Sequence, residues 1–147
     1  MKKELKAFRI LTLLVFVAAL LYVYAGMPER VGVDFTEDGT FTEFVSKRAF
    51  FYGSLGFAFV ANIVFMAFAE LLARSQKGTF AASIQSWLGG FHGIVNLIMV
   101  ISVLFLGILN NPDHAGAQLT VLVYLAPLLL LIATVWLFVI LFRKNAK

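Results

Sequence analysis

Four polar side chains that could carry chemistry fall inside the long apolar stretches of this chain: Asn62, Glu70, His92 and Asn96. Ionisable groups are costly within a membrane-spanning segment and therefore suggest a function, here a proton or ion relay. The alternative is structural. Glu70 can pair with Arg74 one helical turn later, and His92 can hydrogen-bond neighbouring helices together with the two asparagines. We favour the structural interpretation because a transporter would need a longer polar path.

A second polar feature is the segment of residues 27–47, which carries five of the eight acidic residues. Val31, Val33 and Phe35 alternate along it and Asp38-Gly39 supplies turn chemistry, so the pattern predicts a β-hairpin with a two- or three-residue loop. A lone hairpin is only marginally stable, so we expect it to rest on the membrane surface, on residues 110–118, or on a partner. Its candidate residues for recognition or docking are Asp34, Phe35, Glu37, Asp38, Phe41 and Glu43.

The composition of the whole chain indicates a membrane protein. Of its 147 residues, 61% are hydrophobic and 14% are charged, against about 45–50% and about 25% in soluble domains. Four apolar stretches are long enough to cross a bilayer as helices, at residues 8–25, 49–73, 87–109 and 119–142. We therefore predict an all-α integral membrane protein: one domain over residues 1–147, a bundle of four transmembrane helices, and a small extracytoplasmic β-hairpin within residues 26–48.

The distribution of positive charge predicts the orientation of this bundle. Nine of the twelve Lys and Arg residues lie near the two termini or in the loop after residue 73, and three lie between residues 30 and 48. Positive residues favour the cytoplasmic side, so both termini are expected in the cytoplasm and the hairpin outside. We expect the bacterial cytoplasmic (inner) membrane as the location and the lipid bilayer as a partner. The first stretch is expected to remain as a span, because its apolar run is long for a signal peptide.

Several local signals refine the predicted helices. Glycines at Gly53 and Gly56, and in the cluster 89–93, permit close contact between helices. Thr79 is a possible cap for a helix that begins at the membrane interface and continues into the third span. Residues 110–113 have the composition of a turn. Pro127 should kink the fourth span locally, because proline lacks a backbone N–H.

Several classes of function lack their residues in this sequence. Cysteine is absent, and the two histidines, His92 and His114, are expected on opposite sides of the membrane, so no thiolate, zinc or haem site is predicted. The acidic hairpin lacks the spacing of a calcium-binding EF-hand loop, although a weak surface calcium site is an alternative. Neither a nucleophile elbow nor a phosphate-binding loop is present. We therefore expect no enzymatic activity, no cofactor and no nucleic-acid partner.

The segment Met27-Pro28-Glu29-Arg30-Val31-Gly32-Val33-Asp34-Phe35, followed by Gly39 and Ser46-Lys47, resembles a domain of unknown function found in bacterial membrane proteins. That family includes the immunity proteins against the SDP cannibalism toxin. Its pattern begins with Leu-Pro, continues through a short apolar strand, His-Phe and a glycine turn, and ends with Ser-Lys before the next span. Met27 stands here in place of the leucine and Asp34 in place of the histidine. The resemblance covers about residues 10–60 and implies an immunity- or sensor-like membrane protein.

Three functions are compatible with these observations. The first is a non-enzymatic membrane protein that recognises or docks a partner through residues 27–47. The second is an accessory subunit of a larger membrane complex, and the third is a proton-coupled transporter that uses Glu70 and His92. In the first two cases the expected partners are other membrane proteins or further copies of the same chain.

Overall fold

The computed structural model describes residues 3–36, 40–75, 78–111 and 117–145. Four of its helices are long and apolar enough to cross a membrane, which confirms that the four predicted apolar stretches form helices of the required length. All four helices begin before the predicted limits, the first, second and fourth also end after them, and a two-stranded hairpin joins the first two. In chain order the elements are α1 (Lys3–Gly26), β1 (Arg30–Phe35), β2 (Phe41–Ser46), α2 (Lys47–Ser75), α3 (Thr79–Leu109) and α4 (Ala117–Asn145).

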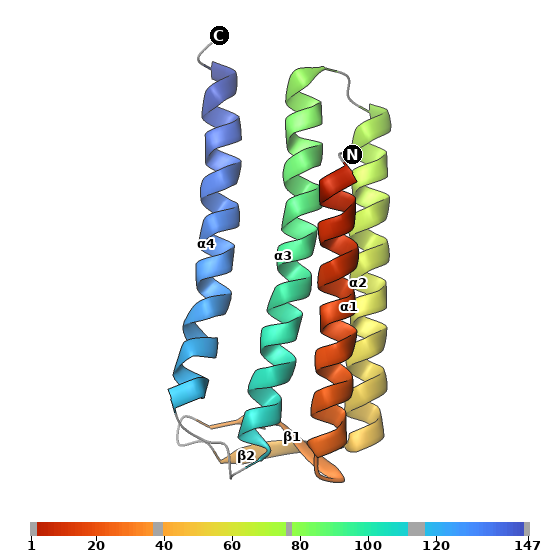
Figure 1. Ribbon diagram of the computed structural model, residues 1–147, viewed down its shortest axis with the longest axis vertical. Coiled ribbons are helices and arrows are strands. Elements are labelled where there is room, and N and C mark those ends of the chain that lie inside the picture. The colour runs from red at the N-terminus through yellow and green to blue at the C-terminus, as the bar shows by residue number, and fades with distance from the viewer. Residues whose placement is uncertain (1–2, 37–39, 76–77, 112–116, 146–147) are drawn as a thin grey trace.

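The helices run side by side and alternate in direction, so that the two ends of the molecule differ (Figure 1). The first turns of α1 and α3 and the last turns of α2 and α4 lie at one end, which we call the terminal end. The hairpin, the last turn of α3 and the first turn of α4 lie at the other, which we call the hairpin end. The orientation of the bundle in a membrane stays a prediction from the positive charges.

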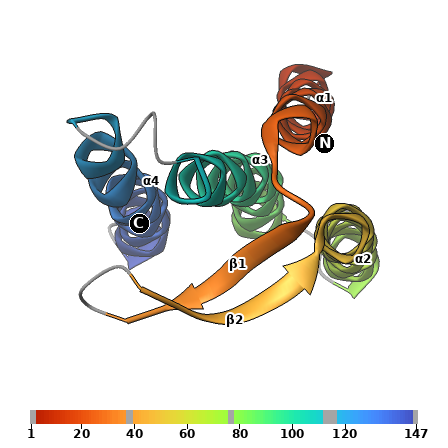
Figure 2. The ribbon, with the colours of Figure 1, turned by 90° about the horizontal axis from the view of Figure 1, so that it is seen from below.

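Helix α3 occupies the centre of the bundle and packs against each of the other three helices. Figure 2 shows this arrangement from the hairpin end, with α1, α2 and α4 placed around α3. Helix α1 buries one stripe of side chains that recurs every third or fourth residue, as an amphipathic helix does. The stripe consists of Thr12, Phe16, Leu20 and Val23. The outward sides of α1, α2 and α4 are apolar, as surfaces in contact with lipid tails require.

Two glycines of α3 admit a large side chain from a neighbouring helix. At Gly90 the ring of Trp136 from α4 fills the space that a Cβ would need, and at Gly93 the ring of Phe8 from α1 does so. The predicted close contact is confirmed for these two positions. It is wrong for Gly53 and Gly56, which meet no atom within 4 Å beyond their own helix backbone. Helix α2 turns a different stripe, around Phe50, Ala58 and Asn62, toward the bundle.

The predicted hairpin is confirmed, and its register is now defined. Strands β1 and β2 pair antiparallel, with Gly32 opposite Phe44, and the register shifts on either side of Asp34. The backbone N–H of Thr36 donates to the carbonyl of Thr40 (2.9 Å) and closes the described part of the hairpin. The turn residues 37–39 lie outside the described residues. Irregular pairing of this kind increases the local twist of a hairpin.

The other local predictions have mixed outcomes. Helix α3 is continuous from Thr79 to Leu109, which confirms that the interfacial helix and the third span form one element. Its N-cap is Gly78 rather than Thr79, since Thr79 is already the first residue of the helix. Gly78 has a positive φ of 120°, a backbone conformation that suits glycine. Helix α4 continues through Pro127. A turn was predicted at residues 110–113, and its first part is described. There the backbone N–H of Asn111 donates to the carbonyl of Ile108 (3.1 Å), whereas residues 112–116 lie outside the described range.

We expect Gly93→Leu to destabilise the bundle, because the added side chain would compete with Phe8 for the same space between α1 and α3. Overpacking of this kind typically costs about 1–3 kcal/mol. The measurement is the unfolding free energy of the purified protein in detergent. Gly53→Leu is the matched control, since its added side chain meets open space. Equal stability of the two variants would contradict the packing seen at Gly93.

Candidate functional site

Three of the four polar residues singled out in the spans meet between α2 and α3. Asn62 Oδ1 lies 2.6 Å from His92 Nε2, and Asn62 Nδ2 donates to Asn96 Oδ1 at 3.0 Å. Asn62 is 8% exposed, His92 is 2% exposed and Asn96 is 0% exposed. The ring of Phe65 stacks on the imidazole at a centroid distance of 5.1 Å. The predicted hydrogen bonding between neighbouring helices is therefore confirmed.

The same set of hydrogen bonds continues into α1. Asn96 Nδ2 donates to Thr12 Oγ1 and to the Arg9 carbonyl, both at 3.3 Å, and Thr12 Oγ1 donates to the same carbonyl at 3.0 Å. We call Thr12, Asn62, His92 and Asn96, with the Arg9 carbonyl, the amide network. The part played by Thr12 was not predicted from the sequence. The sequence feature that could have identified Thr12 is a hydroxyl residue in the apolar stripe of α1, four residues before Phe16.

Within the amide network, His92 donates to Asn62, Asn62 donates to Asn96, and Asn96 donates to Thr12 and to the Arg9 carbonyl. Because an amide oxygen can only accept, the hydrogen between His92 and Asn62 resides on His92 Nε2. Asn62 Nδ2 donates to the Ala58 carbonyl (2.9 Å) as well as to Asn96, so both of its hydrogens have acceptors. The series ends at the Arg9 carbonyl. An amide side chain does not change its protonation in the ordinary pH range, so the two asparagines hold the helices together and do not carry protons.

Glu70 lies apart from the amide network. Its Oε1 atom is 3.0 Å from Arg74 Nε, and the side chains are 63% and 77% exposed, respectively. The pairing predicted for one helical turn is confirmed, and such an exposed ion pair contributes little stability. The structure therefore places Glu70 with Arg74, and His92 with Asn62 and Phe65.

The hairpin is attached to the end of α3 through one side-chain amide. Asn110 Oδ1 accepts from the backbone N–H of Gly32 (2.7 Å), and Asn110 Nδ2 donates to the carbonyl of Gly32 (2.9 Å) and to that of Leu106 (2.9 Å). The amide thus satisfies both backbone groups of one strand residue, as a neighbouring strand would. Val31 is 0% exposed in the core, and the ring of Phe35 packs against Phe105 at 5.9 Å. The expectation that the hairpin rests on the segment beginning at residue 110 is confirmed at Asn110.

The opposite face of the hairpin presents two aromatic rings and a cation. The Arg30 guanidinium lies 5.2 Å from the centroid of Phe44, and the rings of Phe44 and Phe41 are 5.8 Å apart. The Phe41 ring covers Gly32, where a Cβ would collide with it. Phe44 is 48% exposed. We call Arg30, Phe41 and Phe44 the outer aromatic row, since Val31 and Val45 on the other face pack on the core.

The acidic candidates lie beside this row. Asp34 and Glu43 are exposed and stand opposite each other in the register. Asp34 accepts hydrogen bonds from Thr42 Oγ1 (2.9 Å) and from the backbone N–H of Phe35 (3.0 Å). Glu37 and Asp38 lie outside the described residues. Within the described part of the chain, no three His, Asp or Glu residues are grouped so that they could hold a metal ion.

Arg30, Phe44 and Asn110 were absent from the candidates drawn from the sequence. Arg30 and Phe44 become neighbours only when the register is known, because they lie on different strands. Asn110 was assigned to a turn on its local composition. The signal that was available is an amide directly after an apolar helix, where it can pair with backbone groups of another element.

No family model, curated protein or solved structure matches this chain. The resemblance of residues 27–47 to the bacterial membrane domain therefore stays a prediction from the quoted motif.

We expect Asn96→Ala to lower the unfolding free energy by about 1–3 kcal/mol, because it leaves Asn62 Nδ2 and the Arg9 carbonyl with one partner fewer in a buried site. Unfolding of the purified protein in mixed detergent micelles measures the change. Ser102→Ala is the control, because the Ser102 hydroxyl is exposed and donates within its own helix to Ile98 (3.0 Å). A loss of unfolding free energy no larger than that of the control would contradict a structural role of the amide network.

We expect Asn110→Ala to speed backbone amide exchange over residues 30–46, because it removes the acceptor of the Gly32 N–H and the donor to its carbonyl. The acceleration should be about tenfold, from a lost contribution of about 1 kcal/mol or slightly more. Hydrogen exchange read by mass spectrometry measures it. Asn110→Asp retains an acceptor for the Gly32 N–H but lacks the donor, so its exchange should be intermediate. Unchanged exchange in both variants would show that other contacts hold the hairpin.

Proposed function

We propose that this chain is a non-enzymatic multi-pass membrane protein that recognises or docks a partner through its hairpin. The hairpin lies on the outer side of a bacterial cytoplasmic membrane, and the role is immunity- or sensor-like, as the resemblance implies. One observation carries the proposal. Asn110 fixes β1 to α3 while the outer aromatic row, Arg30, Phe41 and Phe44, faces away from the bundle.

The chemistry of the outer aromatic row suits recognition. Aromatic residues and arginine are enriched in protein interfaces, and they supply much of the binding energy where they are found. The attachment through Asn110 and the burial of Val31 hold the row in place before a partner arrives. Binding to such a fixed surface loses less conformational entropy than binding to a free loop does. The exposed carboxylates Asp34 and Glu43 beside the row add a preference for a partner with positive charge.

An accessory subunit of a larger membrane complex is the second candidate, and it would use the same surface for permanent docking. A proton-coupled transporter has less support. Glu70 pairs with Arg74 in an exposed position, and the amide network contains no titratable group besides His92.

We expect a photoreactive benzoylphenylalanine at position 44 to give a discrete cross-linked product in living cells. The same residue at position 57, where Phe57 is 67% exposed on α2, is the matched control for contact with lipid alone. Arg30→Ala, combined with benzoylphenylalanine at position 44, should lower the yield of the cross-linked product several-fold. The reason is that the Arg30 guanidinium packs on the ring at position 44. A product that forms equally at both positions, or at neither, would contradict the proposed surface.

Two further measurements make this result specific. The chain contains no cysteine, so Thr42→Cys gives a single thiol on an exposed hairpin position. Labelling of intact cells by a membrane-impermeant maleimide tests the outward orientation, and protection of the thiol would contradict it. If the cross-linked partner is an integral membrane protein that remains in a stable complex in gentle detergent, the accessory-subunit function is supported instead of an immunity- or sensor-like one.

A further inference from the structure

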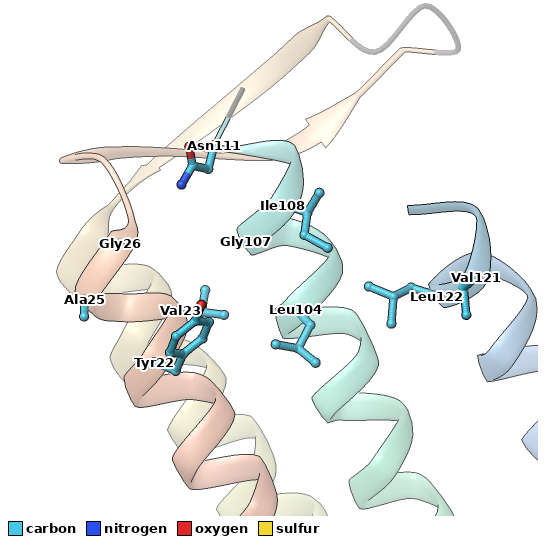
Figure 3. Close-up of a pocket in the computed structure, with 10 residues that line it drawn as sticks. All are labelled: Tyr22, Val23, Ala25, Gly26, Leu104, Gly107, Ile108, Asn111, Val121 and Leu122. Atoms are coloured by element: carbon cyan, nitrogen blue, oxygen red, sulfur yellow. The ribbon is translucent and has the colours of Figure 1, made fainter. Parts of the chain in front are cut away.

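A groove of about 780 Å³ opens at the hairpin end between α1, α3 and α4. Figure 3 shows Leu122 of α4 reaching toward Leu104 and Ile108 of α3, with Tyr22 and Val23 of α1 on the far side. Its volume lies within the range of about 300–1,000 Å³ that small-molecule sites usually have. Among the described residues, the lining consists of aliphatic side chains and glycines apart from Tyr22 and Asn111, and none of these residues is charged.

The described polar side chains of the groove are those of Asn111 and Tyr22. Asn111 lies at the end nearest the hairpin, next to the last residue of α1, Gly26 (Figure 3). Gly26 is the last residue of the first span and Asn111 lies two residues after the third, so both are at the level where a bilayer changes from hydrocarbon to headgroups. Tyr22 lies one helical turn before Gly26, and the other end of the groove, at Leu104, is at the depth of the hydrocarbon. An occupant must therefore have an apolar part several carbon atoms long and a polar part that meets an uncharged amide.

Water cannot fill the apolar part of this groove, because it would find no hydrogen-bond partners there. An empty groove would forfeit the dispersion contacts of its walls. The arrangement of the helices also leaves the groove open rather than closed. Two contacts between α4 and α3, from Trp87 Nε1 to the Ala133 carbonyl (2.8 Å) and from Trp136 to Gly90, belong to parts of the two helices outside the groove lining.

We propose that this groove binds one acyl chain of a membrane phospholipid, taken from the leaflet that meets the hairpin end. The chain lies along Leu104, Ile108 and Leu122, and the ester and headgroup region of the lipid lies at Asn111. The order of polarity along the groove matches that of a lipid in the bilayer, so the lipid enters sideways without turning. This site is separate from the outer aromatic row and does not depend on the proposed recognition function.

The test uses the full-length protein, purified in detergent and depleted of lipid, with dioleoylphosphatidylcholine as the probe. Native mass spectrometry counts bound lipid, and the midpoint of thermal unfolding reports its effect on stability. We expect one lipid to bind tightly and to raise the midpoint. Leu122→Trp fills the groove and should weaken this binding by about tenfold, the ratio that corresponds to 1.4 kcal/mol. Leu131→Trp is the matched control, because Leu131 is 59% exposed on the same helix and does not line the groove.

Three further arms decide between outcomes. Leu104→Trp narrows the groove from α3 and should repeat the effect if Leu122→Trp fails to fold. Lysophosphatidylcholine, with one chain, should compete with the probe, whereas glycerophosphocholine, with no chain, should not. Equal lipid binding by the groove variants and the control would overturn the proposal. A dimer that is lost in Leu122→Trp but kept in Leu131→Trp would also overturn it, because the groove would then belong to a second copy of the chain.

Discussion

The hydrogen bonds of Asn96 set the positions of three of the four helices. Apolar side chains do not drive helices together in a bilayer, because lipid tails are as apolar as the side chains are. A buried amide, in contrast, must find partners, and Asn96 finds them in Asn62 of α2 and in Thr12 and the Arg9 carbonyl of α1. These bonds fix both the rotation and the depth of α1 and α2 relative to α3. The contact of Trp136 with Gly90 brings α4 onto a remaining face of α3, and the contact of Phe8 with Gly93 adds to the packing of α1.

The same chemistry operates at the hairpin end, where Asn110 satisfies the backbone of Gly32. Asn96 and Asn110 belong to one continuous helix and its C-cap, so the bundle and the hairpin are positioned by a common element. The orientation of the outer aromatic row is thus determined by α3 rather than by the turn of the hairpin. An isolated hairpin of two short strands would be marginal, and here the amide, Val31 and Phe35 supply the contacts that a third strand would otherwise give.

Local features were predictable from the sequence, and long-range pairings were not. The spans, the hairpin and the Glu70–Arg74 pair follow from periodicity and charge within a few residues. The meeting of Asn62 with Asn96 could be anticipated because consecutive spans run antiparallel. In contrast, the contacts of Asn96 with Thr12 and of Asn110 with Gly32 join residues 84 and 78 positions apart, and no local pattern identifies such partners. The glycines of α2 were misassigned because a small residue permits a contact without specifying that a neighbour is there.

The satisfaction of polar groups also determines where a ligand could gain binding energy. Among the described residues, no buried side-chain nitrogen or oxygen lacks a hydrogen-bond partner, so the interior of the bundle offers nothing to a polar solute. Between the amide network and the hairpin the core includes Phe16, Leu20 and Val103, and an ion passing there would lose its hydration without replacement. Polar recognition is therefore favoured at the hairpin, where Arg30, Asp34 and Glu43 remain exposed to solvent. Apolar binding is favoured at the groove beside α3, where hydrocarbon contacts are incomplete.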